Sequence, residues 1–146
     1  MRTAGTLLAF DFGEKRIGVA VGETQTRLAH PIGAIAAESN AARFEAIGKL
    51  VAEWKPAGFV VGRPSHADGA PHPIALLAEK FGRRLASRFG LPVAYADETL
   101  SSVAAEERLR DAGRRPRGQG EVDAHAAAVI LEGYFAQLAT HEHSAS

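Results

Sequence analysis

Acidic side chains at the ends of apolar segments are the residues best placed to do chemistry. Asp11 interrupts the first apolar segment close to its end, Asp97 and Glu98 follow the last short one, and Asp123 opens the final helical pattern. Carboxylates are costly to bury as bare anions, so several of them gather at one spot only where cations compensate their charge. Mg²⁺ and Mn²⁺ prefer such oxygen ligands. Two such ions stabilise both the attacking water and the leaving oxygen of a phosphodiester, so the acids predict metal-dependent phosphodiester hydrolysis.

Each of these acids also has a purely structural interpretation. Asp11 stands just before Gly13 and would suit a turn, although a turn does not explain an acid within an apolar strand. Asp97, Glu98 and Asp123 all lie where a helix dipole favours negative charge. Because side chains alternate along a strand, only one of Asp97 and Glu98 is expected to join the site. The functional interpretation therefore depends on all of these acids together and not on any one of them.

Basic residues cluster in two places although the chain as a whole is neutral. The sequence has 17 Lys and Arg against 17 Asp and Glu, so no overall positive charge indicates a nucleic-acid-binding protein. Lys15 and Arg16 lie in the first predicted hairpin, and Arg114, Arg115 and Arg117 lie in a segment that contains several glycines. Both groups are candidates for contact with a phosphate backbone. Solvated loops explain them equally well.

The apolar segments and their periodicity predict an α/β fold. Five short strands are expected, at residues 6–12, 17–22, within 27–36, 58–62 and 92–96. His30 and Pro31 would weaken the hydrogen-bonding ladder of the third strand. Helical spacing predicts helices between about residues 40 and 54, 74 and 89, 103 and 111, and 122 and 138.

This element order predicts a mixed five-stranded sheet flanked by helices. The first three strands are antiparallel hairpins, the remaining strands are parallel, and the first strand is central. Residues 1–138 are expected to form a single domain, followed by a disordered tail at 139–146. Function should gather at the edge where the strand ends meet.

Composition excludes several classes of protein. The chain has 146 residues, of which 46% are hydrophobic and 23% charged, which suits one domain with a real core. It has no cysteine, so disulfides, zinc–thiolate sites and thiol nucleophiles are excluded. It has no Walker A loop, dinucleotide fingerprint or HExxH motif. No apolar run is long enough to cross a bilayer or to act as a signal peptide, so we expect a soluble, cytoplasmic protein without a membrane partner.

Four short blocks of sequence occur in an order typical of one protein family. They are Leu8–Gly13 running into Arg16–Ala20, Val60–Pro64 with Asp68 and Gly69, Asp97–Ser102, and Val122–Ala124 leading to Ile130–Tyr134. Together they resemble the YqgF (RuvX) family of Holliday-junction-resolvase-like proteins, which are described as pre-16S rRNA nucleases. The resemblance covers nearly the whole chain, from about Leu7 to Leu138.

The resemblance implies an RNase H-like nuclease domain and metal-dependent cleavage of nucleic acid. It implies a role in maturing the 5′ end of small-subunit ribosomal RNA, with Mg²⁺ or Mn²⁺ as cofactor. By motif position, Asp11, Glu98 and Asp123 take the catalytic, metal-binding places, and Asp97 is a further candidate ligand. A water activated by the metal attacks the phosphorus in this chemistry, so the protein needs no nucleophile of its own.

The sequence departs from the family pattern at several positions. The family usually has Leu in place of Arg63, Arg in place of Thr99, and a basic residue in place of Glu121. Related resolvases carry an acid at the end of the fourth strand, where this chain has Gly62. Glu98 would then have to supply that carboxylate from the neighbouring strand.

The sequence leaves the substrate and the oligomeric state open. Precursor 16S rRNA is the favoured substrate. The alternatives are branched DNA, which would require a homodimer presenting two sites, and a non-catalytic role as an RNA-binding processing factor. A phosphotransferase related to sugar kinases is disfavoured, because 146 residues do not provide the second lobe that closes over a nucleotide.

Overall fold

The fold is built on a five-stranded mixed sheet. The computed structural model describes residues 4–64, 73–97, 101–113 and 118–144. The strands are β1 (Thr6–Phe12), β2 (Ile17–Glu23), β3 (Ala29–Ile35), β4 (Gly58–Arg63) and β5 (Val93–Asp97). Their spatial order is β3-β2-β1-β4-β5, with β1 antiparallel to β2 and parallel to β4. The central place of β1 and the mixed pairing confirm the predicted sheet.

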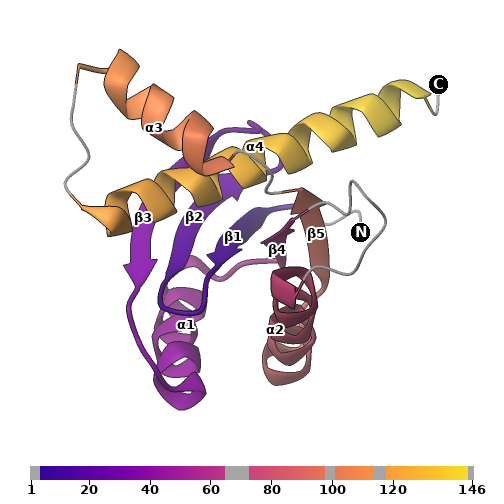
Figure 1. Ribbon diagram of the computed structural model, residues 1–146. Coiled ribbons are helices and arrows are strands. Elements are labelled where there is room, and N and C mark those ends of the chain that lie inside the picture. The colour runs from indigo at the N-terminus through magenta and orange to yellow at the C-terminus, as the bar shows by residue number, and fades with distance from the viewer. Residues whose placement is uncertain (1–3, 65–72, 98–100, 114–117, 145–146) are drawn as a thin grey trace.

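Helices cover both faces of this sheet. They are α1 (Asn40–Trp54), α2 (Pro73–Phe89), α3 (Ser101–Asp111) and α4 (Gln119–Ser144). Figure 1 shows α1 and α2 on one face and α4 running across the other, with α3 beside α4. The predicted α/β class with flanking helices is therefore confirmed.

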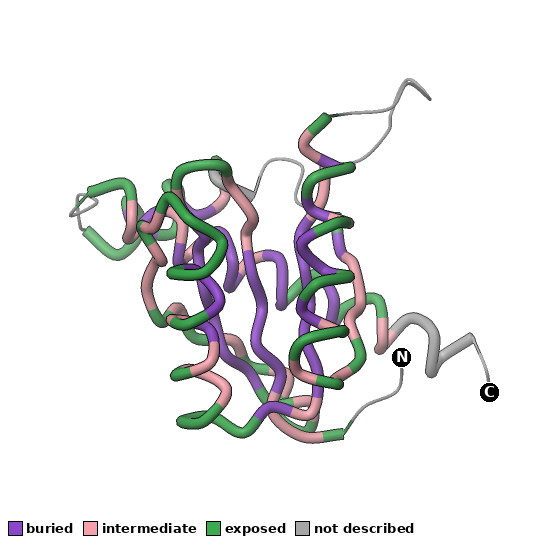
Figure 2. Tube along the Cα trace, turned by 90° about the horizontal axis from the view of Figure 1, so that it is seen from below, coloured by how far each residue is buried: buried purple, intermediate pink, exposed green. Residues whose placement is uncertain are grey.

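The apolar pattern of β1 explains why helices pack on both sides of it. Leu8 and Phe10 belong to the core beneath α1 and α2, whereas Leu7 and Ala9 belong to the core beneath α4. All four side chains are fully buried, and Figure 2 shows buried residues concentrated in the strands at the centre. Aromatic rings fill the first core, where Phe10 and Phe81 meet edge to face with centroids 5.7 Å apart.

Small residues on β2 let α4 lie close to the sheet. The side of β2 that faces α4 carries Gly18, Ala20 and Gly22. A Cβ at Gly22 would lie 2.8 Å from Leu131 Cδ2, so the helix occupies the space that a side chain would need. The distance between α4 and β2 is thus set by residues without bulky side chains.

The third strand shows the irregularity that its proline predicts. Its pairing with β2 shifts register between Val19 and Ala20, so that Pro31 pairs with Ala20 and Gly33 with Val19. A residue without an N–H is tolerated at such a place because the strand is at the edge of the sheet.

The last helix is longer than its predicted range of 122–138. It begins at Gln119 and continues to Ser144, so most of the segment expected as a disordered tail is helical. The chain has no Pro or Gly between Tyr134 and Ser144 that would end a helix. Among the described residues, no helix combines the length and the apolar character needed to span a membrane.

Candidate active site

Asp11 lies near the end of the central strand, with glycine on each side. In the sheet it pairs with Gly18 of β2 and with Gly62 of β4. Alternation along β1 places its side chain on the face of Leu7 and Ala9, which is the face covered by α4. The neighbouring glycines contribute no side chains beside the Asp11 carboxylate.

Asp123 reaches the same place from the first turns of α4. The carbonyl oxygen of Asp123 would lie 2.0 Å from a Cβ added to Gly18. Gly18 is the cross-strand partner of Asp11, and paired residues point to the same face of a sheet. The two acids are 112 positions apart in sequence, yet they lie on one face and at one end of the sheet.

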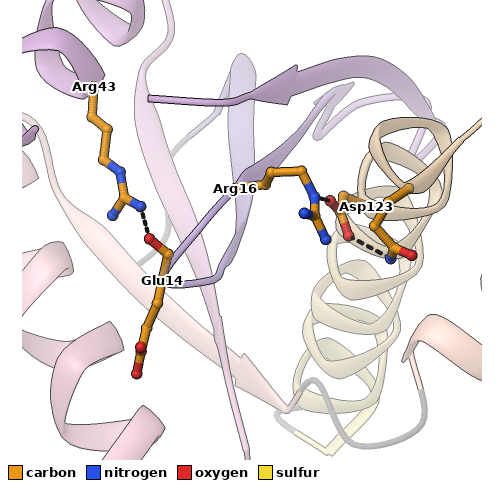
Figure 3. Close-up of polar contacts among 5 residues, drawn as sticks. Glu14, Arg16, Arg43 and Asp123 are labelled. Carbon is orange, nitrogen blue, oxygen red and sulfur yellow. Dashed lines mark hydrogen bonds and ion pairs between the residues drawn. The ribbon is translucent and has the colours of Figure 1, made fainter. Parts of the chain in front are cut away.

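The Asp123 carboxylate is held by two donors. Its Oδ2 accepts a hydrogen bond from Arg16 Nε at 2.7 Å, and its Oδ1 accepts one from Gln119 Nε2 at 3.2 Å. Figure 3 shows Arg16 extending from the β1–β2 hairpin to Asp123 at the start of α4. The Asp123 side chain is only 14% exposed, against 36% for Arg16, so the guanidinium compensates a largely buried negative charge.

Asp97 lies on the opposite face of the sheet from Asp11. It is the last residue of β5 and pairs with Arg63 of β4. Alternation places its side chain with Tyr95, on the side of α2. Glu98, the predicted catalytic residue next to it, lies outside the described residues.

Arg63, which departs from the family pattern, is part of a polar cluster on the α2 side. Its guanidinium lies 4.9 Å from the centre of the Tyr95 ring, and its Nη1 is 2.8 Å from Glu79 Oε1. The Tyr95 hydroxyl donates to the Glu79 carbonyl at 3.1 Å. Burial raises the pKa of Tyr95; Glu79 raises it further, while Arg83 and Arg63 lower it. Arg63 therefore packs against β5 and α2 rather than beside Asp11.

The residues predicted to bind nucleic acid differ in their surroundings. Lys15 is exposed at the tip of the β1–β2 hairpin. Arg16, a candidate for phosphate contact, forms an ion pair with Asp123. Arg114, Arg115 and Arg117 lie outside the described residues.

The residues on this face fit a divalent cation in their chemistry. Asp11 and Asp123 offer carboxylate oxygens, the ligands that Mg²⁺ prefers. Gly18, the strand partner of Asp11, admits the backbone of Asp123 against the sheet. In the part of the chain that the structure describes, no group of three His, Asp or Glu side chains is close enough to hold a metal. The third carboxylate predicted for the site, Glu98, is not among those residues.

Two residues of the site were missed from the sequence, and each carries a signal that points to it. Gly18 is an isolated glycine in a strand, a pattern that indicates close approach of another backbone. Gln119 precedes Asp123 by four residues, the spacing at which side chains on a helix meet.

Comparison with known proteins agrees with the four motifs. A family model described as "RuvX: Holliday junction resolvase" matches residues 5–137. A protein of Dechloromonas aromatica (strain RCB) named "Putative pre-16S rRNA nuclease" is 61% identical over 132 residues, which cover 90% of each chain. A protein of Burkholderia lata with the same name is 52% identical over 139 residues, covering 94% of this chain and 93% of the relative.

Solved structures share the fold at low sequence identity. RuvC of T. thermophilus, solved in complex with a Holliday junction substrate, is 19% identical with a TM-score of 0.56, covering 93% of this chain and 97% of that one. The yeast mitochondrial Holliday junction resolvase Ydc2 is 12% identical with a TM-score of 0.61, covering 98% of this chain and 82% of that one. These likenesses confirm the RNase H-like fold. With the family match over residues 5–137 and relatives more than half identical, the chain belongs to the RuvX family.

Proposed function

We propose that this protein is a nuclease that hydrolyses phosphodiester bonds in precursor 16S rRNA. The observation that carries the proposal is the position of Asp11 and Asp123 on one face and at one end of the sheet. The relatives named as pre-16S rRNA nucleases support the choice of substrate. We propose that it acts in the cytoplasm.

In this proposal Asp11, Glu98 and Asp123 hold Mg²⁺ or Mn²⁺. Asp97 lies on the α2 side of the sheet, so we assign the ligand role to Glu98, the next residue in the chain. When bound, the ion supplies the acidity that turns water into a nucleophile and the positive charge that stabilises the departing oxygen.

The residues around the acids prepare the site for a phosphate. Gln119 orients the Asp123 carboxylate by a hydrogen bond to Oδ1, and Arg16 balances its charge at Oδ2. Gly18 and Gly62 flank Asp11 in the sheet, and the absence of a side chain at Gly18 lets the start of α4 bring Asp123 to the same end of the sheet. We propose that Lys15, together with Arg114, Arg115 and Arg117, contacts the nucleic-acid backbone outside the reacting group.

Cleavage of a precursor 16S rRNA transcript tests this function. Wild-type protein should cleave it with Mg²⁺ or Mn²⁺, and Asp11→Asn should reduce the rate by about a hundredfold or more, because a ligand charge is lost while the shape is kept. Asp111→Asn is the matched control, since Asp111 is exposed at the end of α3. Circular dichroism checks that all three proteins fold. Equal cleavage by wild type and Asp11→Asn would contradict the proposal.

Branched DNA is a second candidate substrate. The description of the family as Holliday junction resolvases favours it, as does the fold shared with a resolvase solved on a junction. A resolvase would act as a homodimer with two sites, whereas processing of an RNA end requires only a monomer. Symmetric nicking of a four-way junction by a dimeric protein, with no cleavage of the rRNA precursor, would support this alternative over the first.

A further inference from the structure

A basic groove runs between α1 and α2, on the face of the sheet away from α4. One part has a volume of about 290 Å³, with Phe12, Phe44 and Phe81 among its apolar lining and Lys80 and Arg84 at its rim. A second part, of about 530 Å³, shares Phe44 and Arg84 with the first and adds Arg88. The shared residues make the two parts one continuous surface, which we call the α1–α2 groove.

The cations of this groove form a regular stripe along α2. Lys80, Arg84 and Arg88 follow one another at intervals of four residues, so they lie on one face of the helix. All three are exposed. Within the described parts of the chain, the ion pairs formed do not involve them. The Arg88 guanidinium lies over the Phe44 ring, 5.4 Å from its centre, so it contacts an apolar ring and not an acid. The stripe therefore presents positive charge along the groove.

A buried guanidinium adds to the positive charge from the side of α1. Arg43 is 6% exposed and donates from Nε to the Ala37 carbonyl at 2.8 Å and from Nη2 to the Glu14 carbonyl. Both acceptors are neutral, so they satisfy hydrogen bonds without cancelling the charge. Among the residues that line the two parts of the groove, Glu14 is the one acid, against the three cations of α2 and Arg43. The balance of charge favours an anionic ligand.

The groove and the acid site meet at the same hairpin. Arg43 holds the Glu14 carbonyl on one side of the β1–β2 hairpin, and Arg16 of that hairpin holds Asp123 on the other (Figure 3). Phe12 lines the groove and follows Asp11 directly in β1. A strand of nucleic acid that passes the end of β1 can therefore reach both the acids and the groove.

We propose that the α1–α2 groove binds the phosphate backbone of a single-stranded segment of the RNA substrate. Spaced cations beside apolar rings match the way proteins hold single strands, with charge for the phosphates and apolar surface for the bases. The two parts of the groove have the volumes of small-ligand pockets, a size that suits one or two unpaired nucleotides. The identity of this ligand rests on the proposed function, while the site itself rests on the charges and the groove.

Binding of a fluorescein-labelled 12-nucleotide single-stranded RNA tests the proposal. Fluorescence anisotropy is measured in EDTA, which prevents cleavage, over a series of KCl concentrations. The variant Lys80→Gln/Arg84→Gln/Arg88→Gln should bind about tenfold more weakly or worse, and its slope of log affinity against log salt should fall by about 2, because each lost phosphate contact removes about 0.7. The control Lys49→Gln/Lys55→Gln/Arg110→Gln removes the same charge from exposed positions elsewhere and should change the slope far less.

A second measurement does not depend on any variant. Photocrosslinking of wild-type protein to RNA containing 4-thiouridine should modify peptides that include residues 80–88. Equal affinity and slope for the two triple variants, with crosslinks confined to other segments, would overturn the groove proposal, as would groove-dependent binding of an acidic peptide in preference to RNA. Wild-type protein that binds RNA through the groove but cleaves no substrate with Mg²⁺ or Mn²⁺ would instead contradict the proposed function.

Discussion

The carbonyl oxygen of Asp123 occupies the place where a side chain at Gly18 would begin. The distance from that oxygen to an ideal Cβ at Gly18 is 2.0 Å. Gly18 is paired across the sheet with Asp11, so this single contact relates the two acids of the proposed site. The start of α4 can lie over β2 only because residue 18 has no side chain.

Gly18→Ala should therefore displace the start of α4 and with it Asp123. A methyl group cannot fit against a backbone oxygen at that distance, so we expect a loss of about 1–3 kcal/mol in the free energy of unfolding together with reduced cleavage. Urea denaturation measures the first effect. Gly133→Ala is the control, because nothing lies within 4 Å of its Cβ, and it should stabilise α4 by about 0.5–1 kcal/mol. Wild-type stability in Gly18→Ala would show that the contact is absent.

Arg16→Gln should strengthen the binding of Mn²⁺. Arg16 Nε lies 2.7 Å from Asp123 Oδ2, so the guanidinium and a metal ion compete for the same oxygen. We expect the affinity for Mn²⁺ to rise by about three- to tenfold, which corresponds to the small free energy of a partly exposed ion pair. Electron paramagnetic resonance of free Mn²⁺ gives the affinity. Lys15→Gln removes the same charge from the neighbouring residue, and an equal rise in that variant would mean that no direct competition occurs.

Stability at alkaline pH should depend on Tyr95. Burial raises the pKa of Tyr95 above its ordinary value of 10.0, so the folded state favours the neutral hydroxyl. The stability from this group is complete below pH 10.0 and is lost as the pH rises through the higher folded-state pKa. Tyr95→Phe should lose about 0.5–1.5 kcal/mol at neutral pH, with its hydrogen bond, and should show a shallower alkaline decline.

Urea denaturation at a series of pH values from neutral to strongly alkaline provides this comparison. Burial also raises the pKa of Tyr134, which is present in both proteins, so its contribution cancels in the difference. A stability difference between wild type and Tyr95→Phe that stays constant with pH would contradict the prediction.

The parts of the fold that follow from local pattern could be predicted from sequence. The apolar residues on both faces of β1 and the turn after Gly13 predicted the central strand and its hairpin correctly. Strand burial and turn formation depend on a few adjacent residues, so a local pattern is enough to predict them. The same pattern predicted that Asp11 lies near the end of that strand. The end of α4 could not be predicted, because the chain after Tyr134 has neither a glycine nor a proline to mark it.

The contacts between distant segments could not be predicted. Arg16 and Asp123 are 107 residues apart, and no local pattern distinguishes an arginine that binds a carboxylate from one that faces a phosphate. The basic stripe on α2 was hidden because Lys80, Arg84 and Arg88 alternate with apolar residues at ordinary helical spacing. Only the packing of α1 against the same sheet face turns that stripe into the rim of a groove.

The central claim is that Asp11 and Asp123 are ligands of the same metal ion. A double-mutant cycle of Mn²⁺ affinity tests it most directly. Wild type, Asp11→Asn, Asp123→Asn and the double variant are titrated under identical conditions, with Asp111→Asn as the control. Because ligands of one ion act as a unit, we expect each single variant to lose most of the affinity and the double variant to lose little more. Losses that add fully in the double variant, or single variants that bind Mn²⁺ as tightly as wild type, would contradict a shared site.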